Sequence, residues 1–270
     1  MNRAPAVANQ FYPGDPKVLS ASLEGLIPRI DSRLKTKALA VISPHAGYVY
    51  SGKVAGETFA KTEIPQSVII LGPNHQGYGA PAALMATGFW EMPMGEVPID
   101  SKLSQAILDE SSLVEPDDLA HRFEHSLEVQ VPFLQKLRDD LAIAPIVLSH
   151  LRYSQCEALG SELAAAIRKF GNPTLIVASS DMTHYETRSS ASAKDKMAIR
   201  HILALDPKGL YDTVHANKIT MCGVIPATVA LIAAIALGAG SAELIRYTDS
   251  GETSGDTEHV VGYAGIVISA

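Results

Sequence analysis

Histidines follow three apolar segments of this sequence, each at the point where a strand would end. The segments 39–42, 68–71 and 175–178 lead into Ser43-Pro44-His45, Gly72-Pro73-Asn74-His75 and Ser179-Ser180-Asp181-Met182-Thr183-His184. A single histidine in such a place could simply cap a strand or bond a turn carbonyl. Three at corresponding places favour neutral imidazoles that converge on a divalent metal ion.

Two imidazoles need at least one further ligand to hold iron or a similar metal, and the sequence offers two candidates. Asp181 would complete a set of two histidines and one carboxylate. Cys222 precedes a predicted helix, whose N-terminus would lower the pKa of its thiol and favour a soft thiolate ligand. Cys222 could instead be a small buried hydrophobic residue, and we assign Cys156 to packing.

A second motif competes with this metal site. The segment from His121 to His125 reads His-Arg-Phe-Glu-His and matches H-x-x-E-H, in which two histidines bind zinc and Glu124 would activate water. The motif needs a regular helix, yet Pro132 follows closely. A solvated helix start is the interpretation that we prefer for His121, so a zinc peptidase is the less favoured alternative.

The apolar segments alternate with helical patterns, which predicts a single three-layer α/β/α domain over residues 1–270 with a largely parallel or mixed central sheet. Such sheets bind ligands beyond the carboxyl ends of their strands, where the histidines fall. The expected strands are 39–42, 67–71, 143–148, 174–178 and 260–268. The expected helices are 17–27, 53–61, 101–110, 125–137, 153–170, 191–204, 207–215 and 225–238.

Composition narrows the class of protein. The net charge is −7, which disfavours nucleic acid as a partner. No secretory signal pattern is present, and the apolar run at 224–237 is too short to span a membrane. With two cysteines, reduced thiols in a cytoplasmic protein are expected.

The sequence resembles the Memo family, which includes AmmeMemoRadiSam system protein B. The resemblance covers nearly the whole chain and lies in blocks in the family order. These blocks are PAVANQFYPGDP, PHAGYVYSGKVAG, LGPNHQG, EHSLEVQVPFLQ, SSDMTHY, MCG, and YTDSGETSGD with VVGYAGIVI. One departure is Asn9, where the family usually has glycine; we expect little effect, because that segment is remote from the ligands in sequence.

The resemblance implies a fold like that of the class III extradiol ring-cleaving dioxygenases. It makes His45, His75 and Cys222 the metal ligands, which favours Cys222 over Asp181. His184 would take the place of the dioxygenase acid/base histidine, and we expect it to be held by Asp181. His125, and with it Glu128, would face the substrate, so the predicted catalytic residues are His184, Asp181 and His125.

The expected function is a metalloprotein with non-haem iron, Fe(II), or with copper or zinc, and with dioxygenase-type redox chemistry as a candidate reaction. A thiolate ligand makes Cu(I) or zinc plausible. The expected substrate-side residues are Tyr48, Tyr50, Asn74 and Tyr185, and Tyr78 is a further aromatic group near the ligands. The alternative is an adaptor that binds a peptide or small molecule without turnover. The resemblance also implies AMMECR-type and radical SAM proteins as pathway partners.

Overall fold

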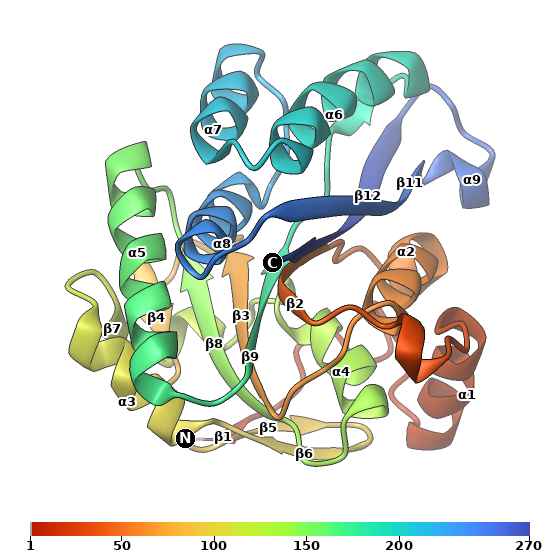
Figure 1. Ribbon diagram of the computed structural model, residues 1–270. Helices are drawn as coiled ribbons and strands as arrows, with labels where there is room; N and C mark the ends of the chain where they lie inside the picture. Colours follow the sequence, from red (N-terminus) through yellow and green to blue (C-terminus); the bar gives the residue numbers. More distant parts are fainter. Residues whose placement is uncertain (1) are drawn as a thin grey trace.

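A mixed sheet forms the centre of the protein, which a computed structural model describes for residues 2–270 (Figure 1). Its core is four parallel strands, in the spatial order β2 (Ala38–Ser43), β9 (Thr174–Ser179), β3 (Ser67–Pro73) and β8 (Ala142–Leu148). Beside β2 lies antiparallel β12 (Val260–Ser269), which also pairs with β10 (His184–Glu186) and β11 (Ser241–Asp249). Beyond β8 lie β4 (Ala82–Leu84) and β7 (Glu115–Pro116). The predicted three-layer fold and sheet are confirmed.

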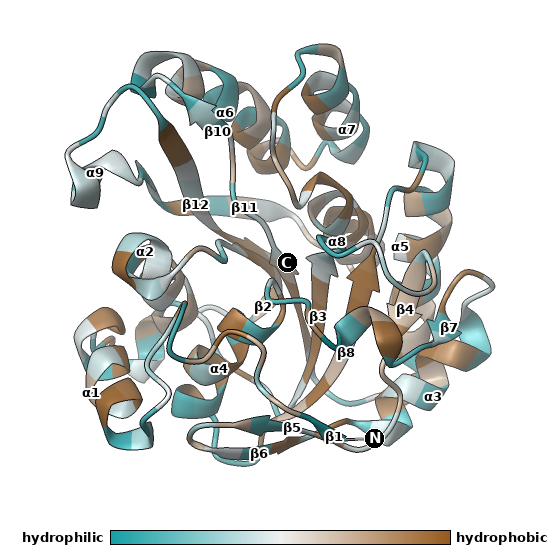
Figure 2. Ribbon diagram, turned by 180° about the vertical axis from the view of Figure 1, so that it is seen from behind, coloured by the Kyte–Doolittle hydropathy of each residue, from teal (hydrophilic) through white to brown (hydrophobic). Residues whose placement is uncertain are grey.

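Helices cover both faces of this sheet, and alternate residues of each strand feed two separate cores. Ala40 and Ile42 belong to one core and Val41 to the other. The first core is covered by α3 (Ser101–Glu110), α5 (Tyr153–Phe170), α6 (Arg188–Leu203), α7 (Pro207–Ala216) and α8 (Val224–Ala236). The second is covered by α1 (Pro16–Leu26), α2 (Tyr48–Ala60) and α4 (Val131–Leu137). Burial on both faces explains why the central strands are continuously apolar, as their brown colour in Figure 2 shows.

A small second sheet packs against the second core, the one covered by α1, α2 and α4. It contains β1 (Asn2–Arg3), β5 (Phe89–Met92) and β6 (Gly95–Pro98). The remaining elements are α9 (Gly251–Ser254) and 3-10 helices at Ser32–Leu34, Leu119–His121 and Glu128–Gln130. The short strands of this sheet were not expected from the sequence, because segments of two to four residues carry too little periodicity to recognise.

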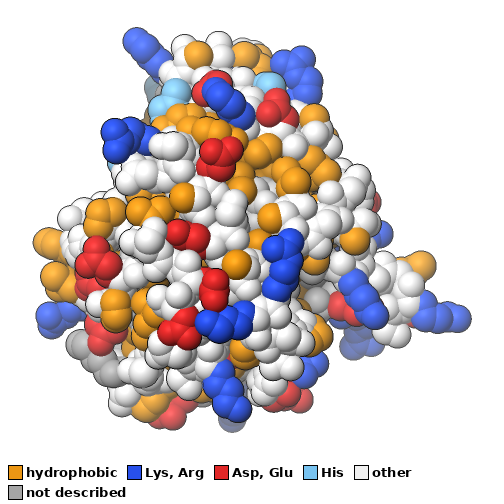
Figure 3. All heavy atoms as spheres, turned by 60° about the vertical axis from the view of Figure 1, so that its left-hand side comes forward, with side chains coloured by type: hydrophobic (Ala, Val, Ile, Leu, Met, Phe, Trp, Pro, Cys, Tyr) orange, Lys and Arg blue, Asp and Glu red, His pale blue; other side chains and the backbone are white. Residues whose placement is uncertain are grey.

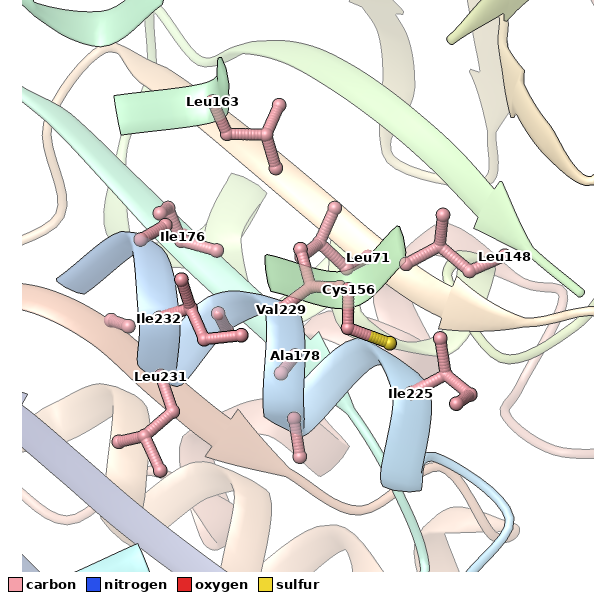
Figure 4. Close-up of a cluster of buried hydrophobic side chains, with 14 of the residues drawn as sticks. Leu71, Leu148, Cys156, Leu163, Ile176, Ala178, Ile225, Val229, Leu231 and Ile232 are labelled. Atoms are coloured by element: carbon pink, nitrogen blue, oxygen red, sulfur yellow. The ribbon is translucent and has the colours of Figure 1, made fainter. Parts of the chain in front are cut away.

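Two predicted helices have different bounds in the structure. The helix expected at 53–61 begins at Tyr48, directly after Gly47, so it begins beside His45. The helix expected at 125–137 begins as a 3-10 turn at Glu128 and becomes α-helical only at Val131. The expectation for Cys156 is confirmed: its thiol lies in the apolar core among Leu71, Val229 and Ile225 (Figure 4).

The surface carries both signs of charge. On the face shown in Figure 3, basic and acidic side chains are interspersed. Among the helices of residues 2–270, none is long and apolar enough to cross a membrane.

Candidate metal centre

Three histidines meet at the carboxyl edge of the parallel strands. His45 follows β2, His75 follows β3, and His125 lies in the loop before the 3-10 turn at Glu128. One ligand atom from each lies within 4.8 Å of the others, and the ring centroids are 4.6 to 5.5 Å apart. This cluster could hold a metal ion. The structure thus brings His45 and His75 together, as the strand ends predict, and adds His125.

The hydrogen bonds around His45 determine its tautomer. Ser179 Oγ donates its only proton to the Ser126 carbonyl at 2.6 Å, and the Gln130 amide donates to the same oxygen at 2.8 Å. His45 Nδ1, 2.9 Å from Ser179 Oγ, must therefore be the protonated nitrogen. Burial holds the pKa of His45 well below its usual value, and the neighbouring His75 and His125 lower it further. His45 is thus a neutral imidazole with a free lone pair on Nε2.

Glu124 orients His75 in the same way. His75 Nδ1 lies 2.8 Å from Glu124 Oε1, and the His75 backbone N–H donates to Oε2 at 2.6 Å. Burial opposes ionisation of Glu124, but the bonds from His75 and the Ser126 N–H lower its pKa to about 2. A carboxylate that binds the outer nitrogen of a ligand histidine is the usual partner at metal sites, and it leaves Nε2 as the second nitrogen of His75.

His125 is less constrained. Its Nδ1 lies 3.5 Å from Glu124 Oε1, and the Phe11 ring lies 4.9 Å from its own. Burial lowers the pKa of His125. The sequence analysis placed His125 on the substrate side and considered it as a ligand only in the zinc-peptidase motif with His121, not together with His45 and His75. The available signal in the sequence was Glu124, which is adjacent to His125, because the outer nitrogen of a ligand histidine commonly bonds a carboxylate.

Cys222 lies against the metal-facing nitrogen of His45. The Sγ atom is 3.3 Å from His45 Nε2 and accepts the Asp181 backbone N–H at 3.3 Å. The contact concerns His45 alone, and among the described residues the cluster of mutually close ligand atoms contains His125 and not Cys222, so Cys222 as third ligand stays a prediction. The expected low pKa is wrong: burial and the charge of Asp181 raise the pKa of this thiol. The N-cap of α8 is Gly223, so Cys222 lies one residue before the cap, where these two effects dominate.

Asp181 and His184 have separate partners. Asp181 Oδ1 accepts the His45 backbone N–H at 2.7 Å, so it anchors the turn that carries His45; burial raises its pKa. His184 is held by Thr220, through its backbone N–H to Oγ1 at 2.7 Å and its Nδ1 to the carbonyl at 2.9 Å. The expectation that Asp181 holds His184 is therefore wrong. The Thr220 carbonyl accepts only, so His184 Nδ1 carries a proton, and Nε2 is the nitrogen without a bond to Thr220.

The four expected substrate-side residues differ in their surroundings. Tyr48 is buried and its hydroxyl donates to the Val129 carbonyl at 2.8 Å, so it serves packing. Asn74 uses its side-chain amide to bond the Tyr78 carbonyl, the Gly77 N–H and the Ser149 hydroxyl. Tyr50 and Tyr185 are 42% and 75% exposed, as is Tyr78 at 51%, and the Tyr185 ring lies 5.8 Å from that of His184. Tyr185 also has a φ of 59°, which is rare for a bulky residue.

Glu128 is not a substrate-side group. It is fully buried and accepts the backbone N–H groups of Ala6 and Val7 and the Tyr12 hydroxyl, and it pairs with Arg3 at 2.7 Å. It therefore binds the N-terminal segment, which places Phe11 against His125. That segment is remote from the ligands in sequence but adjacent in space. Asn9, at a φ of 64°, adopts the backbone region that glycine favours, which accounts for the residue change there.

The H-x-x-E-H segment is not helical, so the zinc-peptidase geometry is absent from it. Only Leu119–His121 forms a 3-10 turn, and Glu124 bonds His75. The solvated helix start expected for His121 is also wrong. His121 is 1% exposed, and its Nε2 lies 3.0 Å from the Ala83 carbonyl. The carbonyls of His121 and Glu124 accept hydrogen bonds from Arg3 in place of α-helical ones.

The fold and the cluster define an α/β protein with a three-histidine site that could bind a metal ion. The sequence model of the Memo-like protein family matches residues 3–267, and the chain belongs to this family. A MEMO1 family protein of Methanothermobacter thermautotrophicus is 40% identical over 276 residues, covering 98% of this chain and 99% of the relative. One from Aquifex aeolicus is 41% identical over 266 residues, with 98% of each chain covered.

A solved structure shares the fold at much lower sequence identity. The crystal structure of an uncharacterized protein from Escherichia coli K12 aligns with a TM-score of 0.57 and 14% identity. The alignment covers 84% of this chain and 98% of that one. At this identity the likeness concerns the fold alone.

Proposed function

We propose that this protein is a metalloprotein that binds a non-haem iron or copper ion through His45, His75 and Cys222. The observation that carries the proposal is the pair of outer contacts on Nδ1 of both histidines, which leave Nε2 as the nitrogen available to a metal ion in the cluster. Neutral imidazoles with occupied outer nitrogens are the form that a metal ion requires. Family membership supports the same donor set.

The donor set fits a metal of borderline to soft character. Imidazoles suit iron, copper and zinc, and a thiolate beside them shifts the preference towards Cu(I) and zinc. His125, the remaining imidazole of the cluster, is the alternative third ligand. An iron or copper ion would supply open coordination positions for a ligand and the capacity for redox chemistry.

Metal analysis of anaerobically purified protein tests the site. The variants are His75→Ala, Cys222→Ser and His125→Ala, and His259→Ala, at an exposed position, is the control. We expect His75→Ala to lose the metal and His259→Ala to keep it. Loss of the metal in Cys222→Ser supports the proposed ligand set. Loss in His125→Ala without loss in Cys222→Ser would identify His125 as the third ligand in place of Cys222. Full retention in both His75→Ala and Cys222→Ser would overturn the assignment.

The finer proposal is that the site turns over a catechol-like substrate, with His184 as acid and base. Its Nδ1–H is held by the Thr220 carbonyl, which leaves Nε2 ready to accept a proton and return it. Oxygen uptake with catechol by the Fe(II)-loaded protein is the measurement. We expect His184→Gln to reduce the rate by about 100-fold or more while metal content is unchanged.

A second candidate function is capture of a flat ligand without turnover. The exposed faces of Tyr50 and Tyr185 favour it, since aromatic faces bind planar ligands by stacking. The same assay separates the two functions, because a binding protein would bind catechol and consume no oxygen.

A further inference from the structure

Every backbone N–H of the segment 181–184, which ends at His184, donates a hydrogen bond. Three of these groups donate to a sulfur, a carbonyl oxygen or a hydroxyl oxygen: Asp181 to Cys222 Sγ, Met182 to the Gly262 carbonyl and His184 to Thr220 Oγ1. The fourth, that of Thr183, donates to Oδ1 of Asp195 on α6 at 2.9 Å. A carboxylate from another element thus holds the residue that precedes His184.

The Asp195 carboxylate is enclosed by the protein. The residue is 0% exposed, and its second oxygen accepts the Tyr247 hydroxyl of β11 at 2.8 Å. Burial raises the pKa of Asp195, and the hydrogen bonds from Thr183 and Tyr247 oppose this rise. Burying a carboxyl group costs free energy unless donors satisfy it. Here one of those donors belongs to the segment that carries His184.

Gly262 on β12 fixes the place of this carboxylate. A Cβ atom at Gly262 would overlap Asp195 Oδ2, so the β12 backbone packs directly against the carboxylate. The N–H of the same glycine donates to the Thr183 carbonyl at 2.9 Å. Thr183 is therefore held at its N–H by α6 and at its carbonyl by β12, which leaves the adjoining backbone of His184 little freedom.

The ring of His184 depends on this backbone. The backbone N–H and Nδ1 of His184 both bond Thr220, at 2.7 and 2.9 Å. The two bonds form together only when the His184 backbone stays beside Thr220. A shift of the segment would break both, and the ring would lose the contact that orients it.

We infer that Asp195 is a positioning residue of His184: its carboxylate holds Thr183 so that the His184 ring keeps its bond to Thr220. The inference rests on the proposed role of His184 as acid and base. A displacement of about 1 Å at a group that takes part in the chemistry can lower a rate by about 100-fold, so the effect should be measurable.

The first measurement is NMR of the Nδ1–H proton of His184 in the full-length zinc-loaded protein, identified by its absence from His184→Gln. The bond to the Thr220 carbonyl slows exchange of this proton with water. Asp195→Ala removes the acceptor of the Thr183 N–H, and we expect the resonance to be lost. Asp195→Asn keeps an oxygen that can accept this N–H, and Tyr247→Phe removes only the other donor, so both should keep the resonance. Its retention in Asp195→Ala would overturn the assignment of Asp195.

The second measurement is oxygen uptake with catechol by the Fe(II)-loaded protein. We expect Asp195→Ala to lower kcat about 100-fold at nearly unchanged KM and metal content. Tyr247→Phe should lower the melting temperature and leave kcat unchanged, because Asp195 keeps its bond to Thr183. Equal kcat in Asp195→Ala and the wild type would contradict the inference.

Two further comparisons separate the possible failures. Asp195→Ala also leaves the Tyr247 hydroxyl buried without an acceptor, so the double variant with Tyr247→Phe removes that cost to folding and should show the same two losses. A wild-type protein that consumes no oxygen would overturn the proposed turnover. The NMR measurement would then decide the assignment of Asp195 by itself.

Discussion

At the scale of single residues, the candidate site depends on what the outer nitrogens of its histidines touch. Ser179 holds His45, Glu124 holds His75 and Thr220 holds His184, each by way of Nδ1. In each case the partner occupies Nδ1 and leaves Nε2 for other contacts. This arrangement suits metal binding by the first two histidines and proton transfer by the third.

Glu124→Gln should weaken metal binding about 10- to 100-fold. Glutamine has one acceptor oxygen where the carboxylate has two, so in either orientation its amide nitrogen faces a donor that now bonds Glu124, and the charge that holds His75 is lost. Competition with a chromophoric chelator for Zn(II) measures the change. Glu162→Gln, which alters a carboxylate bonded to Ser111 and Ser112, is the control. Wild-type zinc affinity in Glu124→Gln would contradict the role given to this carboxylate.

His121 should make the stability of the fold depend on pH. Burial, with the charge of Arg3, lowers its pKa from 6.5 to about 4. The unfolded chain therefore takes up this proton at higher pH than the folded protein, and stability falls as pH decreases from about 6.5 to 4. The expected loss from this group is roughly 3 kcal/mol.

Chemical denaturation at several pH values compares the wild type with His121→Gln. Glutamine can keep a donor near the Ala83 carbonyl but does not titrate. The stability advantage of the wild type at pH 7 should shrink by about that amount at pH 4. A difference that is independent of pH would contradict the prediction.

At the scale of elements, the loop at 121–128 and the N-terminal segment support each other. Arg3 donates to two carbonyls of the loop, and Glu128 accepts from three groups of the segment. Because the loop carries Glu124 and His125, and the segment carries Phe11, this pairing positions one side of the cluster. An irregular loop can be this rigid only when its polar groups are satisfied by other segments.

Glu128→Gln should destabilise the protein by about 3 to 5 kcal/mol, because it leaves the Arg3 guanidinium buried without its charge partner. Hydrogen exchange should increase within residues 2–12. Lys136→Gln is the control, since its exposed pair with Glu24 should contribute less than about 1 kcal/mol. Unchanged exchange in the N-terminal segment of Glu128→Gln would show that the segment is held by other contacts.

At the scale of the whole molecule, the candidate ligands come from segments far apart in the chain. His45 follows β2 and His75 follows β3, whereas His125 precedes α4 and Cys222 precedes α8. The unfolded chain does not hold these groups together, so a metal ion bound at this site would stabilise the folded protein.

Zinc should therefore raise the unfolding free energy by about 2.7 kcal/mol when its free concentration is 100 times the dissociation constant. Thermal unfolding with and without a chelator measures this. The shift should vanish in His75→Ala, which removes one of the ligands. An equal shift in that variant would place the metal elsewhere on the chain.

The sequence by itself determined the layered fold and the two strand-end histidines that the structure brings together, His45 and His75. Strands buried on both faces must be continuously apolar, so their ends are visible in the sequence, and parallel strands bring those ends to one edge. Only the tertiary structure decided the tautomers, the place of His125, the partner of His184 and the roles of Glu124 and Glu128. The physical reason is distance along the chain: Ser179 is 134 residues from His45, and Glu128 is 122 from Ala6. No local pattern records such contacts, because they form only when the two cores have packed.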